Sequence, residues 1–309
     1  MTDVQVRPGP GLVAADGVPP PIRRRRKWRR GFTAWLFMLP LIAVNVLVVV
    51  GPSIATIYYS MTDWTGLGPA SFIGLDNYRH AFADSAFREA LIHNFEWLGL
   101  FLVVPGALGL LGSYLLSQIK RFQILFRTIF FIPYVIASVV NAAVWQNLLS
   151  PTTGIGPHVG INTAFFGNPS TSLMSVNFVV DWHWWGFLAV IFLAAMQSVD
   201  PELYDAAKVD GAGRWQQYRY ITLPGIRPTL VFLGLMTVIW SLKSFDYVFI
   251  ITKGGPAGSS EVVTTLMYRE AFNEYRAGYA ASLGLSLAFA TAIVLAIYEI
   301  LRRRRGWES

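Results

Sequence analysis

Two charged residues lie inside the apolar stretch formed by residues 228–251, namely Lys243 and Asp246. A charge inside a membrane costs at least ~2.5–3.5 kcal/mol on insertion scales, so both side chains should face protein or water. An ammonium or carboxylate group can hydrogen-bond the hydroxyls of a solute, and an aromatic ring can stack on the solute's apolar face. These residues and nearby side chains are therefore candidates for lining a path for a hydroxyl-rich solute. The candidates are Asn141, Trp240, Lys243, Asp246 and Tyr247.

A structural role is the alternative for these residues. Side chains three positions apart share one face of a helix, so Lys243 and Asp246 could pair and hold this helix to its neighbours. Polar side chains in membranes also hydrogen-bond between helices. Two interpretations are therefore open for four polar residues, which either join the path from the second and third predicted helices or link helices: Asn94, Glu96, Asn141 and Gln146.

The sequence lacks the residue patterns of common catalytic sites. No lysine follows a glycine, so the GxxxxGK[ST] loop that cradles nucleotide phosphates is excluded. There is no GxSxG motif of a nucleophilic serine. The four histidines have no metal-ligand spacing, and they are His80, His93, His158 and His183. We expect no catalytic residue, no metal site and no cofactor bound by this chain.

A polar, charged island at residues 200–224 separates two apolar runs. Asp200 and Pro201 predict a helix start, because an aspartate side chain accepts orphan amide hydrogens and proline needs no donor in the first turn. Gly211 predicts the helix end, since glycine turns the backbone at little steric cost. A second short segment follows from Arg214 to Ile221. The island therefore predicts a helix–turn–helix.

The composition indicates a membrane protein. The 309 residues are 54% hydrophobic with a mean hydropathy of +0.45, which is too apolar for an ordinary soluble domain. A bilayer core of ~30 Å needs about 20 apolar residues per helix. We predict an all-α membrane protein with six transmembrane helices, at about 32–60, 97–119, 128–149, 178–199, 228–251 and 277–298. Trp182, Trp184 and Trp185 near the start of the fourth helix are interpreted as an interfacial belt.

The placement of Lys and Arg predicts the orientation. With six spans, nineteen of the 25 cations fall on the side of the N-terminus and five on the other side. Because cytoplasmic segments carry the excess of Lys and Arg, both termini should be cytoplasmic in a multi-pass protein of the bacterial cell (cytoplasmic) membrane. The run Arg23–Arg30 beside the first span suits anionic lipid better than nucleic acid, so we expect no nucleic-acid partner.

Three segments follow from this pattern. Residues 1–30 form a disordered basic cytoplasmic tail, and residues 31–94 hold the first transmembrane helix and an external segment. Residues 95–305 form a core of five transmembrane helices that includes the cytoplasmic loop 200–224.

The island resembles the EAA loop of ABC-importer permeases. The family's usual glutamate is replaced by Asp205, and the other matching residues are Ala206, Ala207, Asp210, Gly211, Ala212, Leu223 and Pro224. Three further motifs stand in the family's order, at 72–78 (FIGLDNY), 132–133 (IP) and 254–257 (GGPA). Over roughly residues 30–305, the chain is similar to carbohydrate-importer permeases of the maltose-transporter type.

This resemblance implies the type I ABC-importer permease fold. It also implies a heterodimer with a second permease subunit, two ATPase subunits that bind ATP and Mg, and an external sugar-binding protein. The EAA-like residues would then couple this chain to the ATPase, and Gly254, Gly255 and Pro256 would contact the binding protein. The candidate path residues would line the route of a sugar.

An ion-coupled carrier or channel acting without an ATPase is the alternative, with Lys243 and Asp246 as its ion-coupling site. A lone carrier has no reason for an ATPase-docking helix at residues 200–224, which disfavours this alternative.

Overall fold

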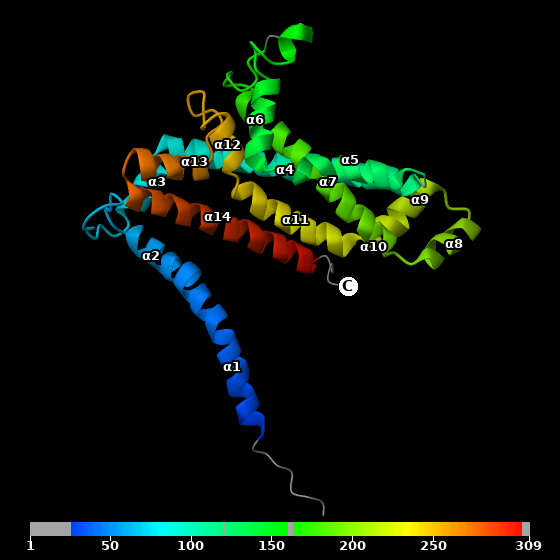
Figure 1. Ribbon diagram of the computed structural model, residues 1–309, viewed down its shortest axis with the longest axis horizontal. Helices are drawn as coiled ribbons and strands as arrows, with labels where there is room; N and C mark the ends of the chain where they lie inside the picture. The colour runs from blue at the N-terminus through cyan, green and yellow to red at the C-terminus, as the bar shows by residue number, and fades with distance from the viewer. Residues whose placement is uncertain (1–25, 120, 160–162, 305–309) are drawn as a thin grey trace, which may run out of the picture. The chain divides into compact units, whose positions relative to one another are not determined.

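The computed structural model describes residues 26–119, 121–159 and 163–304 (Figure 1). These residues are almost entirely helical, and their only extended pairing is one isolated antiparallel bridge between Thr62 and Phe72. Disorder is predicted for residues 1–30; residues 1–25 lie outside the described part, and residues 26–30 are helical. The chain divides into two compact units, residues 1–54 and 55–309.

The first unit holds most of the first predicted span. α1 (Arg26–Asn45) continues through a π-helical turn, η1 (Val46–Val50), into α2 (Gly51–Tyr59). The segment Trp35–Tyr59 is long and apolar enough to cross a membrane, with a mean hydropathy of 2.2 over its most apolar part. This agrees with the span predicted at residues 32–60.

The second unit is built on long helices that lie side by side (Figure 1). They are α4 (Ser85–Gln118), α5 (Gln123–Val135), α7 (Ser172–Gln197), α11 (Arg227–Leu242) and α14 (Ala277–Arg304). Small residues allow α7 to approach its neighbours closely. A Cβ on Gly186 would lie 1.7 Å from the Phe130 carbonyl oxygen, and one on Gly109 would lie 2.8 Å from Leu188 Cβ. Such contacts are typical of helix pairs in membranes.

The third predicted span, residues 128–149, is not one straight helix. It is divided between α5 and α6 (Ser138–Leu148), whose axes meet at 95°. Pro133 lacks the amide hydrogen that continues a helix, and Ile136 and Ala137 are extended, with ψ of 130° and 139°. Among the described residues, five helices are long and apolar enough to cross a membrane singly, or up to six spans exist if this bent pair counts as one. α6 points away from the parallel helices and packs against α12 (Asp246–Ile251) (Figure 1).

Short elements occupy the two ends of this unit. One end holds α3 (Asp76–Ala83), α13 (Val263–Tyr268) and η4 (Arg269–Asn273), whereas η2 (Gly156–Val159) lies beyond α6 (Figure 1). The other holds α8 (Pro201–Val209), α9 (Arg214–Gln217), η3 (Tyr218–Thr222) and α10 (Leu223–Gly225) (Figure 1). A buried apolar cluster lies at each end. The cluster around Phe87 and Leu283 lies at the end with α3, and the cluster around Phe192 and Ile226 lies at the end with α8. A third cluster around Trp97 and Phe101 lies beside the break between α11 and α12.

Candidate functional site

A cavity of about 330 Å³ lies where the helix of residues 227–251 is broken. α11 ends at Leu242 and α12 begins at Asp246, so three residues between them lie outside regular helix. The cavity is lined from α4, α6, α7, α11 and α12. Its lining residues are Trp97, Phe101, Ser138, Val180, His183, Trp184, Trp240, Lys243, Ser244, Phe245, Asp246 and Tyr247.

The charged residues of this cavity are exposed and do not pair with each other. Lys243 and Asp246 both face solvent, and no ion pair joins them within the part of the chain that the structure describes. The two residues do not share one helical face, as the structural alternative requires, because α11 ends at Leu242 and α12 begins only at Asp246. Asp246 instead accepts a hydrogen bond from Ser138 Oγ of α6 at 3.0 Å. No pattern in the sequence pointed to this partner, which is 108 positions away.

Aromatic rings form one wall of the cavity. Trp184 of α7 stacks on Trp240 of α11 with ring centres 4.4 Å apart and planes at 29°. α7 begins at Ser172, so Trp184 lies about 18 Å along the helix at 1.5 Å per residue. The interpretation of Trp184 as part of an interfacial belt is therefore wrong, because the residue lies within the helix bundle and lines the cavity.

Asn141 supports the cavity from behind. Its side chain is only 1% exposed, and its Nδ2 donates to Tyr247 Oη at 3.1 Å and lies 3.5 Å from His183 Nδ1. Asn94 Oδ1 accepts a hydrogen bond from Val263 N at 2.9 Å, and Gln146 Nε2 donates one to the Ile251 carbonyl oxygen at 3.0 Å. Each bond links a helix to the backbone of another segment. Of the five candidate path residues, the structure brings four onto the cavity surface and places Asn141 beneath them.

The polar island forms a hairpin, residues 200–225, at the opposite end of the helices from α3 (Figure 1). Asp200 Oδ1 accepts a hydrogen bond from Glu202 N at 2.9 Å, and Pro201 occupies the first turn of α8. Gly211 turns the chain with φ of +79°, in the left-handed region that favours glycine. Tyr204 Oη and Thr222 Oγ1, 2.9 Å apart, join the two arms. The local structure therefore agrees with the predicted helix–turn–helix.

The hairpin exposes most of the EAA-like residues. Asp205, Ala206, Asp210, Gly211 and Pro224 are exposed, and Ala207, Ala212 and Leu223 are half-buried. Asp205 pairs with Lys208 at 2.7 Å, on the surface. The hairpin also exposes large apolar side chains that sequence reasoning did not single out, namely Leu203, Val209, Trp215 and Tyr220. Exposed apolar side chains next to charges are typical of a protein-docking surface.

The loop after α12 is compact. Gly254 has a φ of +85°, and Ser260 Oγ donates to the Gly255 carbonyl oxygen at 2.7 Å. Gly254 is buried against Glu261, whereas Gly255 and Pro256 are half-buried. Arg269 Nη1 lies 2.6 Å from Glu261 Oε2. Burial raises the pKa of the Glu261 carboxyl above its ordinary value, and Arg269 partly opposes this shift.

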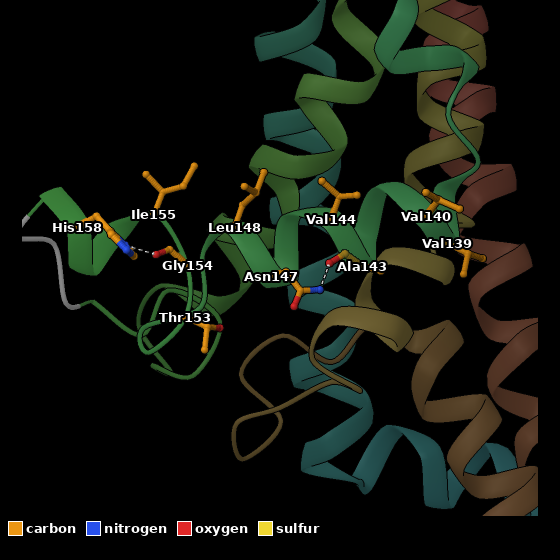
Figure 2. Close-up of a pocket in the computed structure, with 10 residues that line it drawn as sticks. All are labelled: Val139, Val140, Ala143, Val144, Asn147, Leu148, Thr153, Gly154, Ile155 and His158. Atoms are coloured by element: carbon orange, nitrogen blue, oxygen red, sulfur yellow. Dashed lines mark hydrogen bonds between the residues drawn. The ribbon is translucent and has the colours of Figure 1, made fainter.

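An apolar groove of about 830 Å³ runs along the outer face of α6 (Figure 2). Val140, Val144 and Ile155 line it. Its two largest polar side chains are engaged locally, because Asn147 donates to the Ala143 carbonyl and His158 Nδ1 lies 3.1 Å from the Gly154 carbonyl oxygen (Figure 2). This surface offers apolar contact and no charged group.

A metal centre is not supported by the described residues, since no three His, Cys, Asp or Glu side chains among them are grouped to hold an ion. The arrangement as a whole combines membrane-spanning helices, a polar and aromatic cavity among them and a protruding hairpin at one end.

Comparison with known families identifies this arrangement. The family model of the binding-protein-dependent transport system inner membrane component matches residues 106–307. The chain belongs to this family. A probable ABC transporter permease protein of Pyrococcus horikoshii is 33% identical, over 85% of this chain and 93% of the relative. The diacetylchitobiose uptake system permease protein of Streptomyces coelicolor is 32% identical, over 97% of this chain and 89% of the relative.

The permease fold is that of a solved ABC transporter. A bacterial ABC transporter involved in the import of the acidic polysaccharide alginate superposes with a TM-score of 0.80 at 25% identity, over 92% of this chain and 99% of that chain. This permease is therefore a multi-pass membrane protein with the ABC-importer permease fold, and its family is not a family of enzymes.

Proposed function

We propose that this chain is the membrane-spanning permease subunit of an ATP-driven carbohydrate importer. The observation that carries the proposal is the hairpin at residues 200–225, which protrudes from one end of the helices and exposes charged and apolar side chains. In an ABC transporter permease, such a surface suits docking of the ATPase. A carrier acting without an ATPase has no use for it.

The partners follow from the family. A binding-protein-dependent system requires an external binding protein, and the loop containing Gly254, Gly255 and Pro256 is the surface that we assign to it. A second permease subunit pairs with this chain in the bilayer. Two ATPase subunits hold ATP and Mg, and the EAA-like residues transmit their closure to the permease.

Transport by this chain is a change between two states. Closure of the ATPase pair moves α8, and α8 is tied through Tyr204 and Thr222 to the segment that leads into α11. The movement therefore reaches α11 and the cavity where α11 ends. ATP shifts the equilibrium between inward- and outward-facing states only if it binds one of them more tightly.

The cavity chemistry supports a carbohydrate as the substrate. Lys243 and Asp246 offer a donor and an acceptor, and Trp184 and Trp240 offer an aromatic face. A sugar ring presents hydroxyls and an apolar face that match these groups. The names of the similar proteins refer to diacetylchitobiose and alginate, which are both carbohydrates.

The orientation with both termini in the cytoplasm is supported by the distribution of charge. The end of the helices that carries the hairpin also carries Arg121, Arg127 and Arg227, as well as the arginines at the end of α14. Excess Lys and Arg on one side is the mark of cytoplasmic segments.

Reconstitution tests the proposal. The permease pair is purified with its ATPase in lipid nanodiscs, the binding protein is added, and ATP hydrolysis is measured across a panel of mono- and oligosaccharides. We expect at least one carbohydrate, delivered by the binding protein, to stimulate hydrolysis. Hydrolysis that responds to ion gradients and to no carbohydrate would contradict the proposal.

A further inference from the structure

A second, polar cavity of about 710 Å³ lies between the hairpin and the ends of the long helices. The hairpin contributes Tyr204, Lys208 and Arg214 to its lining. The helix ends contribute Tyr114 and Gln118 from α4, Gln123 from α5 and Gln197 from α7. The cavity is thus bounded by the moving element on one side and by the helix bundle on the other.

The lining is cationic and rich in hydrogen-bonding groups. Arg214 and Lys208 are its charged residues, and no Asp or Glu lines it. Arg214 pairs with no carboxylate in the described ranges. Lys208 donates to Asp205 at 2.7 Å, just outside the cavity, and an ammonium group has two further donors. The cavity therefore favours an anion.

The neutral groups around these cations define the rest of the ligand. Tyr114 and Tyr218 lie edge to face, with ring centres 4.7 Å apart, and glutamine side chains also line the cavity. Hydroxyls and amides recognise a polyhydroxyl group, whereas guanidinium and ammonium groups recognise phosphate. The volume far exceeds the roughly 30 Å³ that one water occupies in the liquid.

We propose that this cavity binds a phosphomonoester with a polar, hydroxylated body, and that the bound ligand inhibits transport. Two sources share the phosphomonoester, a soluble sugar phosphate, which also carries the hydroxylated body, and the headgroup of phosphatidic acid, which offers the phosphate alone. The inhibitory part rests on the proposed function, since it assumes that the hairpin transmits the ATPase movement. A ligand held by Arg214 on the hairpin and by Gln123 and Tyr114 on the bundle would brace the two against each other. A brace that favours one state resists the transition to the other.

Binding and hydrolysis are measured separately, so that failure of the site and failure of the coupling model can be told apart. The complete transporter is placed in phosphatidylcholine nanodiscs and titrated calorimetrically with glucose 6-phosphate, with glucose and inorganic phosphate for comparison. ATP hydrolysis is then measured in the same discs. A second set of discs contains phosphatidic acid. The test variant is Arg214→Gln, and the matched control is Arg219→Gln, an exposed arginine of the same hairpin that does not line this cavity.

We expect glucose 6-phosphate to bind the wild type and the Arg219→Gln control, and to bind Arg214→Gln at least about tenfold more weakly, as the loss of a charge-assisted hydrogen bond predicts. Hydrolysis should fall on binding. Inhibition by phosphatidic acid that depends on Arg214, with no binding of the sugar phosphate, would assign the site to lipid. Binding of glucose 6-phosphate without a fall in ATP hydrolysis would support the binding site and contradict its regulatory role. The proposed site would be contradicted if Arg214→Gln and Arg219→Gln responded equally to glucose 6-phosphate and to phosphatidic acid, or if neither probe had an effect.

Discussion

At the scale of single residues, the cavity beside the α11–α12 break is built from charges that remain unpaired with each other. Lys243 and Asp246 are three positions apart, which on a continuous helix would bring them together. The break at Lys243 separates them, and Ser138 takes the place of Lys243 as the partner of Asp246. Two exposed charges on a cavity wall are available to form hydrogen bonds with a substrate.

Because Lys243 and Asp246 do not pair with each other, we can predict the stability and the uptake of the variants Lys243→Met and Asp246→Asn. Both side chains are exposed, so each single variant should change the free energy of unfolding by no more than about 0.5 kcal/mol. Carbohydrate uptake should fall about tenfold or more, because each substitution removes a charged hydrogen-bonding group from the path. Thermal unfolding and uptake into proteoliposomes are the two measurements.

The double variant is the control for this prediction. The change in the free energy of unfolding in the double variant should equal the sum of the two single changes to within about 0.5 kcal/mol, because the two groups do not interact. The difference from that sum is the coupling energy. Uptake should stay low in the double variant. A coupling energy above about 1 kcal/mol, or uptake restored by the second substitution, would mean that the residues form a structural pair.

At the scale of elements, the hairpin turn depends on one glycine with ample space around it. Gly211 has a φ of +79°, and a Cβ added there would meet nothing within 4 Å. A side chain at this position therefore costs backbone strain within the chain but causes no clash. Any larger effect must come from a partner surface.

Gly211→Asp should abolish carbohydrate-stimulated ATP hydrolysis while the permease remains folded. Gly68→Asp is the matched control, because Gly68 also has a positive φ, +76°, and nothing within 4 Å, and it lies in the predicted external segment. The strain of the two substitutions should be similar, roughly 1–2 kcal/mol or less for an aspartate in the left-handed region. Equal loss of stimulated hydrolysis in both variants would show that strain, rather than docking, is responsible.

Asp205→Lys tests the same docking surface by charge. The reversal replaces an exposed pair with Lys208 by a like-charge pair, which costs only about 0.2–0.5 kcal/mol in the helix. Stimulated hydrolysis should nevertheless fall strongly if Asp205 faces the ATPase. Wild-type hydrolysis in this variant would remove Asp205 from the docking surface.

The loop after α12 is the second element with a testable charge arrangement. Glu261 is buried and its pKa is raised by burial, so the folded loop favours the protonated carboxyl. The contribution of this protonated carboxyl to the free energy of unfolding is greatest at low pH. It is lost as the pH rises above 4.5, the ordinary pKa of a glutamate, and through the raised pKa of Glu261. Arg269 offsets the cost of the charged carboxylate at neutral pH.

Arg269→Gln should therefore destabilise the loop by about 1–3 kcal/mol at pH 7, and the loss should shrink as pH falls and Glu261 is protonated. Limited proteolysis of the loop at several pH values measures this. Adding Glu261→Gln removes the unpaired charge and should recover most of the stability. A loss that is the same at every pH, or that persists in the double variant, would contradict the role of the Glu261 charge.

At the scale of the whole molecule, α7 offers a direct test of orientation. It is 26 residues long, or about 39 Å at 1.5 Å per residue, which exceeds the bilayer core of ~30 Å. Ser170 precedes it, Ser198 follows it, and both are exposed. The chain contains no cysteine, so introduced thiols have no background within this subunit.

Ser170→Cys should react in intact cells with a membrane-impermeant maleimide, and Ser198→Cys should react only after the membrane is permeabilised. The serine-to-cysteine change is the same at both ends of one helix, so each variant controls for the other. Labelling of Ser198→Cys from outside would invert the proposed orientation. It would also place the hairpin outside the cell, where no ATPase could reach it.

Much of this protein follows from the sequence because the signals are local or additive. Apolar runs and the placement of Lys and Arg predict spans and orientation from the cost of burying polar groups in lipid. Asp200, Pro201 and Gly211 predict the hairpin, because caps and left-handed turns depend on a few neighbouring residues. The order of the motifs indicates the family that the comparison confirms.

The cavities were decided only by the tertiary structure. The bend at Ile136 and the break at Lys243 arise where α5, α6, α11 and α12 meet, and no periodicity in the sequence marks them. Trp184 joins Trp240, and Ser138 joins Asp246, through contacts between residues more than 50 positions apart. Such contacts depend on how helices pack, which a one-dimensional pattern of apolar and charged residues does not encode.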